Sequence, residues 1–366
     1  MRFLKGVTAL AILSAVSAVA LGSARAADQD QPKPIVKKAK PIIDVPFFSY
    51  VDNRLTYAHV FNAIDAGYYR AKPGGGYQGS FDQDVVAFTH FDTWAYGTNF
   101  LTIGVYKSGK LDAAAPCTNA GEITTPSGTV AANCAGATTV YGVVRSTFGF
   151  NEIFDTKAFS WGPLRNVSLE VGADAGSQNT YFAAAPFKGF VGLQFAFDLP
   201  YKGYINVAPM YKLPENTHNG YTQCGNVFAN PAPFCNNDGN MRFRGTWAVE
   251  ANYAMDLGFL PESIQYFSIS GRAGFYGPKG PFQGLAGQEP TKMEINTEPV
   301  RLTFDAGRAF LGKQYAHEVD YWVAYRYWKN QYGDDANSAP FVCTVNGVST
   351  KTCTASSVAT GVTVKF

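Results

Sequence analysis

Charge is scarce in this sequence. Charged residues make up 16% of the 366 residues, whereas an ordinary soluble domain carries about 25%. The net charge of +2 at pH 7 gives no sign of a nucleic-acid binding surface, so we expect no nucleic-acid partner. Aromatic residues reach 15%, and 37 residues are glycine. Low charge with abundant aromatic residues and glycine is typical of a β-barrel whose apolar face contacts lipid.

Long apolar runs are equally scarce. After the opening segment the chain has no run of about 18 apolar residues, so we expect no membrane-spanning helix. The opening differs, because the basic start Met1–Lys5 precedes an apolar stretch over 8–21 and the small-residue pattern Ala24-Arg25-Ala26. This order predicts a secretory signal peptide, residues 1–26. No cysteine stands at the cleavage point, so a lipoprotein is not expected.

Recognisable catalytic motifs are missing as well. The chain has no G-x-S-x-G, and its four histidines lack a partner motif. The glycine-rich run 73–77 opens no predicted helix, so a phosphate-binding loop is not expected. Neither C-x-x-C nor a Cys/His cluster at ligand spacing occurs, which argues against zinc. We therefore expect no enzyme, no cofactor and no metal.

The six cysteines form three pairs that are local in sequence. In a secreted chain an even number of cysteines predicts disulfides, although six cysteines allow 15 pairings. Each local pair lies within one polar segment, and closing such a loop would contribute on the order of 3 kcal/mol against the unfolded chain. Neighbour pairing is therefore our hypothesis: Cys117 with Cys134, Cys224 with Cys235, and Cys343 with Cys353.

Residues 27–49 are rich in proline and lysine. Such a segment cannot bury a core, so we predict a flexible periplasmic segment, either a solvated spacer or a contact for an anionic polymer. The end of the chain is the opposite case, because Val358, Thr360, Val362, Val364 and Phe366 alternate with small or polar residues. Period two over about ten residues predicts a strand long enough to cross a bilayer. Its aromatic terminus resembles the closing strand of outer-membrane barrels.

Comparable alternation recurs along the chain, with one apolar face and one charged face. A soluble sandwich would turn its polar face to bulk water, whereas a membrane barrel turns it to the lumen. Apolar faces of about nine to eleven residues, aromatic ends, and alternately short and long connections favour the barrel. The predicted strands lie near 53–62, 83–93, 98–107, 140–150, 166–174, 186–199, 201–213, 241–256, 264–276, 294–305, 315–332 and 357–366.

The predicted fold is therefore all-β, a transmembrane antiparallel β-barrel of about twelve strands over residues 50–366, in a bacterial outer membrane. Pro299 implies a bulge in the tenth strand. With both ends periplasmic, every cysteine pair falls in an outward loop. The expected partners are outer-membrane lipid and lipopolysaccharide, the barrel-assembly machinery through Phe366, and a small-molecule solute.

Inward-facing residues form the candidate site. Their mixed signs predict either a transverse field across a pore or a salt-bridged plug, and both fit a barrel of about twelve strands. Inward aromatic rings beside ionisable groups would suit a flat, hydrogen-bonding solute, or they simply pack the interior. The candidate channel-lining and solute-binding residues are Glu170, Lys188, Phe190, Tyr204, Asn206, Arg242, Arg244, Glu250, Arg272, Arg301, Glu318, Asp320, Trp322, Arg326 and Trp328.

The stretch 90–100 is expected to form a tight turn between two strands, with Gly97 and Asn99 supplying turn conformations. His90 and Asp92 are either a proton-sensitive pair or turn caps. The stretch resembles the Trp-x-Tyr-Gly-x-Asn-Phe signature of Tsx-like nucleoside-specific outer-membrane channels, and the residues that carry this resemblance are Trp94, Tyr96, Gly97, Asn99 and Phe100.

The resemblance implies a monomeric twelve-stranded barrel with a narrow channel that takes up nucleosides. The sequence departs from the pattern at Thr98, where an acidic residue is common, and in its long cysteine-bearing loops. We therefore expect passive diffusion of nucleosides or similar polar aromatic molecules. A general porin, and a structural or adhesive barrel with disulfide-tied loops, remain the alternatives.

Overall fold

A computed structural model describes residues 47–109, 111–113, 117–119, 122–125, 128–131, 136–179, 185–218, 240–280, 292–339 and 342–366. The predicted signal peptide and most of the predicted 27–49 segment lie outside these residues. Residues 46–366 form one compact unit. Among the described residues, no helix has the length and apolar character needed to cross a membrane.

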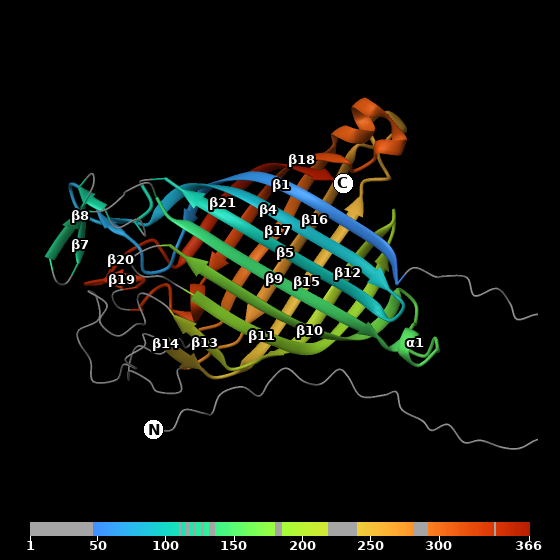
Figure 1. Ribbon diagram of the computed structural model, residues 1–366, viewed down its shortest axis with the longest axis horizontal. Helices are drawn as coiled ribbons and strands as arrows, with labels where there is room; N and C mark the ends of the chain where they lie inside the picture. The colour runs from blue at the N-terminus through green and yellow to red at the C-terminus, as the bar shows by residue number, and fades with distance from the viewer. Residues whose placement is uncertain are drawn as a thin grey trace, which may run out of the picture. The chain divides into compact units, whose positions relative to one another are not determined.

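Twelve antiparallel strands close into a ring, because β1 pairs with β21 and β10 pairs with β11 (Figure 1). This confirms the predicted fold class. The ring strands are β1 (Phe48–Ile64), β4 (Ser80–Trp94), β5 (Gly97–Ser108), β9 (Thr138–Gly149), β10 (Leu164–Gln178), β11 (Ala185–Leu199), β12 (Gly203–Lys212), β15 (Thr246–Asp256), β16 (Phe267–Tyr276), β17 (Glu294–Asp305), β18 (Val319–Lys329) and β21 (Thr354–Lys365).

Side-chain alternation orients each strand. On β21, Val358 and Val364 are exposed on the outer face, while Ala359 and Thr363 are buried on the inner face. A closed barrel satisfies every backbone hydrogen bond between strands, which is what a bilayer demands of a chain that crosses it with strands. An apolar outer belt around a polar interior is the architecture of bacterial outer-membrane barrels. The protein is located in that membrane.

Pro299 produces the predicted bulge. The register between β17 and β18 shifts between Thr297 and Val300, and the register between β16 and β17 also shifts there. Pro299 and Val300 are both exposed on the outer face. The shift in side-chain parity therefore turns both Glu298 and Arg301 toward the lumen, and alternation alone could not foresee this.

The two ends of the barrel differ. The connections 65–79, 109–137, 213–245, 277–293 and 330–353 lie at one end, here called the loop end, and within the described residues four of them carry short strands. The described ones include β6 (Cys117–Asn119), β7 (Glu122–Thr125), β8 (Gly128–Ala131), β13 (Glu215–His218), β14 (Asn240–Phe243), β19 (Thr344–Val345) and β20 (Val348–Ser349). Long loops mark the extracellular side of such barrels and shorter connections the periplasmic side.

The opposite end, here called the turn end, has tight turns at 95–96 and 200–202, together with three longer connections. One contains helix α1 (Phe150–Ile153), the second, 257–266, contains a 3-10 turn, Glu262–Ile264, and the third, 306–318, contains a π-helical turn, Gly307–Leu311, that projects beyond the strands (Figure 1). The prediction that a strand begins at 315 was therefore wrong, because 313–315 forms a 3-10 turn and the strand starts at Val319.

The Trp-x-Tyr-Gly-x-Asn-Phe motif lies at the turn end. Trp94 packs against Tyr96 and Phe148, with ring centroids 5.3 and 5.9 Å apart. We expected Gly97 to supply a turn conformation, but it begins β5 and its φ is not positive. Glycine is required because a Cβ there would meet the carbonyl oxygen of Thr147 at 1.8 Å. Asn99 lies in β5 and donates a hydrogen bond to Asp92.

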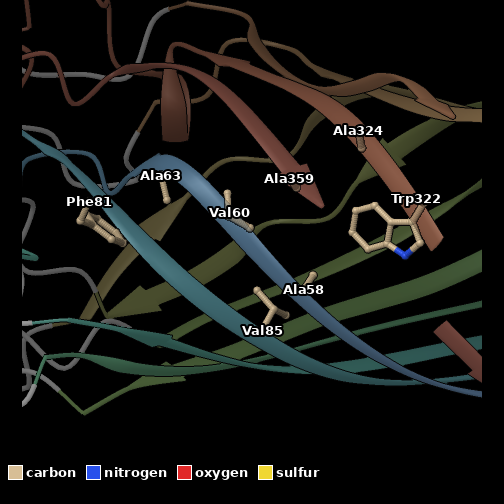
Figure 2. Close-up of a cluster of buried hydrophobic side chains, with 8 residues drawn as sticks. All are labelled: Ala58, Val60, Ala63, Phe81, Val85, Trp322, Ala324 and Ala359. Atoms are coloured by element: carbon tan, nitrogen blue, oxygen red, sulfur yellow. The ribbon is translucent and has the colours of Figure 1, made fainter. Parts of the chain in front are cut away.

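Small apolar side chains gather on the inner wall beside the β1–β21 seam. Figure 2 shows this cluster, with alanines, valines and Phe81 from β1, β4, β18 and β21, and with Trp322 at one edge of the group. The Trp322 indole N–H donates to the Thr363 hydroxyl at 3.1 Å. At the loop end a disulfide joins Cys343 to Cys353, as predicted, and this bond ties the connection 330–353. Cys134, Cys224 and Cys235, and the Cys117 side chain, lie outside the described part of the chain.

Candidate functional site

An ion pair crosses the lumen. Arg145 on β9 makes two hydrogen bonds to Glu250 on β15, at 2.8 and 3.0 Å. Going round the wall, β10, β11 and β12 stand between these two strands, so the contact is a chord across the interior. Arg145 also binds Asp174 on β10 at 2.7 Å. Paired, charge-assisted bonds of this kind fix geometry as well as contributing energy.

Other interior groups hold this ion pair in place. The Arg145 guanidinium lies over the Phe190 ring, 4.5 Å from its centroid. Tyr276 donates to Glu250 at 3.0 Å, and Tyr141 donates to Asp174 at 3.1 Å. Glu170, which accepts from Gln194 at 2.9 Å, lies within electrostatic range of Glu250. We call Arg145, Glu170, Asp174 and Glu250 the acidic bridge, since three carboxylates share one arginine.

A second cluster of charged residues lies on the adjoining strands. Its ratio of arginine to carboxylate is the reverse of that in the acidic bridge. Arg301 pairs with Glu298 at 2.6 Å, while Arg326 lies 3.8 Å from the same carboxylate. Arg272 stands opposite Glu298 in the β16–β17 register, and its side chain is exposed. We call Arg272, Glu298, Arg301 and Arg326 the arginine strip. Here three arginines share one carboxylate.

The predicted aromatic rings differ in how accessible they are. Phe190 and Trp322 are 2% and 6% exposed, and each is covered by an arginine, with the Arg301 guanidinium 4.0 Å from the centroid of Trp322. Trp328 is partly buried and donates to Glu294 at 2.8 Å. Tyr204 is 36% exposed on the inner face of β12. Among these four rings, Tyr204 is the one with a face open to a solute.

Tyr204 reaches well into the lumen. Its hydroxyl interacts electrostatically with Arg54 on β1, although β15, β16, β17, β18 and β21 separate the two strands on that side of the wall. Arg54 itself pairs with Asp52 at 2.6 Å. Asn206, on the same face as Tyr204, donates to Asn252 at 3.1 Å. The turn half of the lumen therefore combines an open ring with hydrogen-bonding groups.

The loop half of the interior is more crowded. The Lys188 ammonium lies 5.7 Å from the centroid of the Tyr332 ring, which comes from the connection 330–353. Lys212 pairs with Glu215 at 2.8 Å, and Lys279 also contacts Glu215. Gln331 and Thr352, from the same connection, are buried. These residues form a cover over the loop-end mouth, here called the loop-end cover.

Carboxyl groups in the loops at this end are perturbed by burial. Desolvation raises the pKa of Asp334 to about 7, although Lys279 opposes the shift. Burial, with the neighbouring Asp112 carboxylate, also raises the pKa of Asp65, while a hydrogen bond from Gln178 opposes the shift. Some charge at the loop end therefore changes near neutral pH.

Three residues predicted to line the channel are not seen on its wall. Arg244 is exposed in the link between β14 and β15, and Glu318 is exposed in the connection before β18, so neither belongs to the wall. Both fall just outside strands whose predicted bounds were too long. The side chain of Arg242 lies outside the described residues. Asp320 faces inward and contacts His317 rather than the bridge or the strip.

Several residues that form or support the charged clusters in the lumen were not predicted from the sequence. Arg145, Tyr141 and Tyr276 lie on strands whose alternation is blurred by neighbouring glycines or valines, and Glu298 is inverted by the bulge. The pair His90 and Asp92, with 3.0 Å between Nε2 and Oδ2, is also bonded to Asn53 and Asn99 near the turn end. This arrangement is consistent with a capping network around that end.

Comparisons with known proteins give only distant structural similarities. No family model matches the chain, and no curated protein matches it. Solved structures that are similar include an outer-membrane channel from Pseudomonas putida F1, with 8% identity, TM-score 0.44, and coverage of 88% of this chain and 98% of that one. The translocator domain of the autotransporter NalP from Neisseria meningitidis has 10% identity, TM-score 0.36, and coverage of 86% and 88%.

LpxR from Salmonella typhimurium has 10% identity, TM-score 0.35, and coverage of 86% of this chain and 100% of that one. At such identities and TM-scores these similarities carry no argument about solute or activity. The functional argument therefore depends on the interior of this barrel itself.

Proposed function

We propose that the protein is a non-catalytic channel for passive diffusion of small polar solutes across the outer membrane. The observation that carries this proposal is the lumen, where an acidic bridge adjoins an arginine strip inside a closed barrel. Charge of opposite sign on adjoining walls creates a field across the passage, and oriented polar solutes interact with both sides. Because the Arg145–Glu250 contact crosses the interior, the passage is narrow.

We propose nucleosides, or similar flat molecules with hydroxyl groups, as the solute class. The carboxylates of the acidic bridge can accept hydrogen bonds from hydroxyls, and the arginines can donate to acceptor edges of a ring. Tyr204 offers the open aromatic face on which a base can stack. The resemblance of residues 94–100 to nucleoside-specific channels supports the same class. Binding at each contact must remain weak, so that the solute leaves as readily as it enters.

The test is to reconstitute refolded protein in a planar bilayer and record conductance while titrating nucleosides, sugars and amino acids. We expect small conductance steps that nucleosides block saturably. Large steps that no solute blocks would indicate a general porin. Silence with correctly folded protein would direct attention to the loops, as in a structural or adhesive barrel.

The role of Tyr204 can be tested with a matched control on the same strand. Tyr204→Ala removes the inward ring, whereas Tyr211→Ala removes a ring on the outer face of β12. We expect the first variant to weaken nucleoside block while leaving the conductance steps in place. The second should behave like the wild type. Equal block in both variants, with normal folding, would remove stacking on Tyr204 from the proposal.

A further inference from the structure

A histidine and two aspartates meet at the turn end, away from the acidic bridge and the arginine strip. Asp305 is the last residue of β17 and stands directly opposite Asp320 on β18. His317 lies in the connection 306–318 that joins the two strands. Its Nδ1 is 3.2 Å from Asp320 Oδ1 and 3.8 Å from Asp305 Oδ2. One ligand atom from each residue lies within 4.8 Å of the others.

Within the described residues, the ion-pair partner of both carboxylates is the imidazole of His317. Asp305 and Asp320 are 2% and 4% exposed, and within the described residues neither forms an ion pair with lysine or arginine. The backbone N–H of Arg308 donates to Asp305 Oδ1 at 2.8 Å. In the part of the chain described, Asp305 Oδ2 accepts no hydrogen bond, and it points at the His317 nitrogen. Two buried like charges in direct register are unfavourable unless a positive charge lies between them, and either protonated His317 or a metal ion can supply it.

The distances fit a small metal ion. Zinc binds imidazole nitrogen and carboxylate oxygen at about 2.0–2.2 Å, so two ligand atoms at tetrahedral angles lie roughly 3.3–3.5 Å apart. The two separations from His317 Nδ1, 3.2 and 3.8 Å, lie on either side of that range. The third separation, between the two carboxylates, is within 4.8 Å.

A third carboxylate, that of Asp256, contacts the same histidine. On the other side of the imidazole, Nε2 faces Asp256 Oδ1 of β15 at 3.7 Å. Histidines that bind metal through one nitrogen commonly turn the other toward a carboxylate, which fixes the ring and raises its basicity. Asp256 comes from a different strand, so the arrangement does not follow from local chain geometry alone.

We propose that Asp305, His317 and Asp320 bind a divalent first-row transition metal, with zinc as the representative ion and water as the fourth ligand. An imidazole with two monodentate carboxylates suits such metals, whereas calcium and magnesium prefer more oxygen ligands. Binding requires His317 Nδ1 to be free of its proton, which is released to solvent. The site anchors the projecting connection 306–318 to β17 and β18 at the periplasmic mouth. It goes beyond the proposed channel function and does not depend on it.

The test uses untagged, refolded barrel stripped of metal, because a polyhistidine tag would bind the same ions. Zinc chloride is titrated calorimetrically, and cobalt chloride is added in parallel, since four-coordinate Co²⁺ absorbs strongly in the visible range. Folding of every variant is checked by heat-dependent gel mobility. The variants are His317→Gln and Asp320→Asn at the ligands, and Asp256→Asn behind the histidine. The control is His59→Gln, whose histidine contacts one carboxylate, Asp84, at 2.9 Å, rather than three.

We expect one zinc ion per chain and a four-coordinate Co²⁺ spectrum in the wild type and in His59→Gln. The spectrum should disappear in folded His317→Gln and Asp320→Asn, and zinc affinity should fall about 10- to 100-fold in Asp256→Asn. Absence of zinc binding by the folded wild type would overturn the proposal. So would zinc binding that is unchanged in folded His317→Gln and Asp320→Asn. These measurements need no conductance, so failure here is separate from failure of the channel proposal.

Discussion

The acidic bridge and the arginine strip use the same residue types in inverse proportion. In the bridge one arginine serves three carboxylates, and in the strip one carboxylate serves three arginines. The bridge reaches across the barrel, while the strip stays on three consecutive strands, β16, β17 and β18. The difference indicates two roles: the bridge sets the width of the lumen, and the strip sets the sign of the field along one wall.

The arginines of the two regions also differ in exposure. Arg145 and Asp174 are largely buried, with side-chain exposures of 11% and 9%, whereas Arg272 is exposed to the lumen. A buried charge that loses its partner is costly, while an exposed charge can be changed with little effect on stability. Substitutions should therefore affect stability and width in the bridge, and ion selectivity in the strip.

The largest effect is expected from Arg145→Ala. The substitution opens the contact across the lumen and leaves Asp174 and Glu250 without their cation. We expect larger single-channel conductance, together with a loss of about 3–5 kcal/mol of unfolding free energy. Urea-induced unfolding in bilayers and single-channel recording measure the two quantities. Arg165→Ala, which removes an exposed pair with Asp198, is the control and should cost about 0–1 kcal/mol.

If Arg145→Ala conducted like the wild type while remaining folded, the bridge would not define the width. Should the control lose as much stability as Arg145→Ala, the distinction between buried and exposed pairs would be wrong.

Reversing one charge of the strip should change selectivity with little change in stability. Arg272→Glu places a carboxylate opposite Glu298 and leaves the crossing contact intact. We expect the reversal potential in a salt gradient to move toward cation preference, because the local field changes sign. The unfolding free energy should stay close to that of the wild type. An unchanged reversal potential would show that permeating ions do not pass the strip.

A smaller effect in the opposite direction is expected from Glu298→Gln. This substitution removes the one carboxylate of the strip and leaves three arginines close together. We expect a modest move of the reversal potential toward anion preference, which high salt should diminish by screening. A move toward cation preference would contradict the assignment of Glu298 to this group.

The smallest effect is expected in the loop-end cover. Asp334 has a folded pKa of about 7, above its ordinary value of 3.8, because it is buried. The folded cover therefore holds a proton that the unfolded segment releases between roughly pH 4 and pH 7, so its stability falls as pH rises through that window and then levels off. We expect faster proteolysis of 330–353 at pH 8 than at pH 5.

Asp334→Asn should remove most of this pH dependence, because the amide does not titrate. Asp335→Asn, at a neighbouring carboxylate that is only partly buried, is the matched control and should retain the pH dependence. Identical pH profiles in the wild type and Asp334→Asn would assign the effect to another group, with Asp65 the next candidate.

Much of the barrel was predictable because its wall obeys one simple rule. A strand with one face in lipid and one in the lumen must alternate, and strands such as β11, β18 and β21 do so clearly. The bulge at Pro299 was predicted correctly, because proline cannot donate a hydrogen bond to a neighbouring strand. Cys343 and Cys353 were paired correctly from their shared polar segment.

The site was less predictable, because its contacts join residues far apart in sequence. Arg145 and Glu250 meet only after the ring closes, and no local pattern contains the distance across a barrel. Glu298 was hidden by the parity shift at Pro299. Trp322 was proposed as a stacking ring, but Arg301 already covers it, and such a contact cannot be read from alternation. Asp305 and His317 likewise meet through a turn whose shape the sequence did not reveal.

The most direct test of this account records single-channel conductance of the wild type and Arg145→Ala in the same bilayer, with and without a nucleoside. The account predicts small wild-type steps that a nucleoside blocks saturably, and larger steps in the variant with weaker block. Large, unblocked steps in the wild type, or steps of equal size in both proteins, would contradict the claim that the Arg145–Glu250 contact forms the narrow, solute-binding part of the lumen.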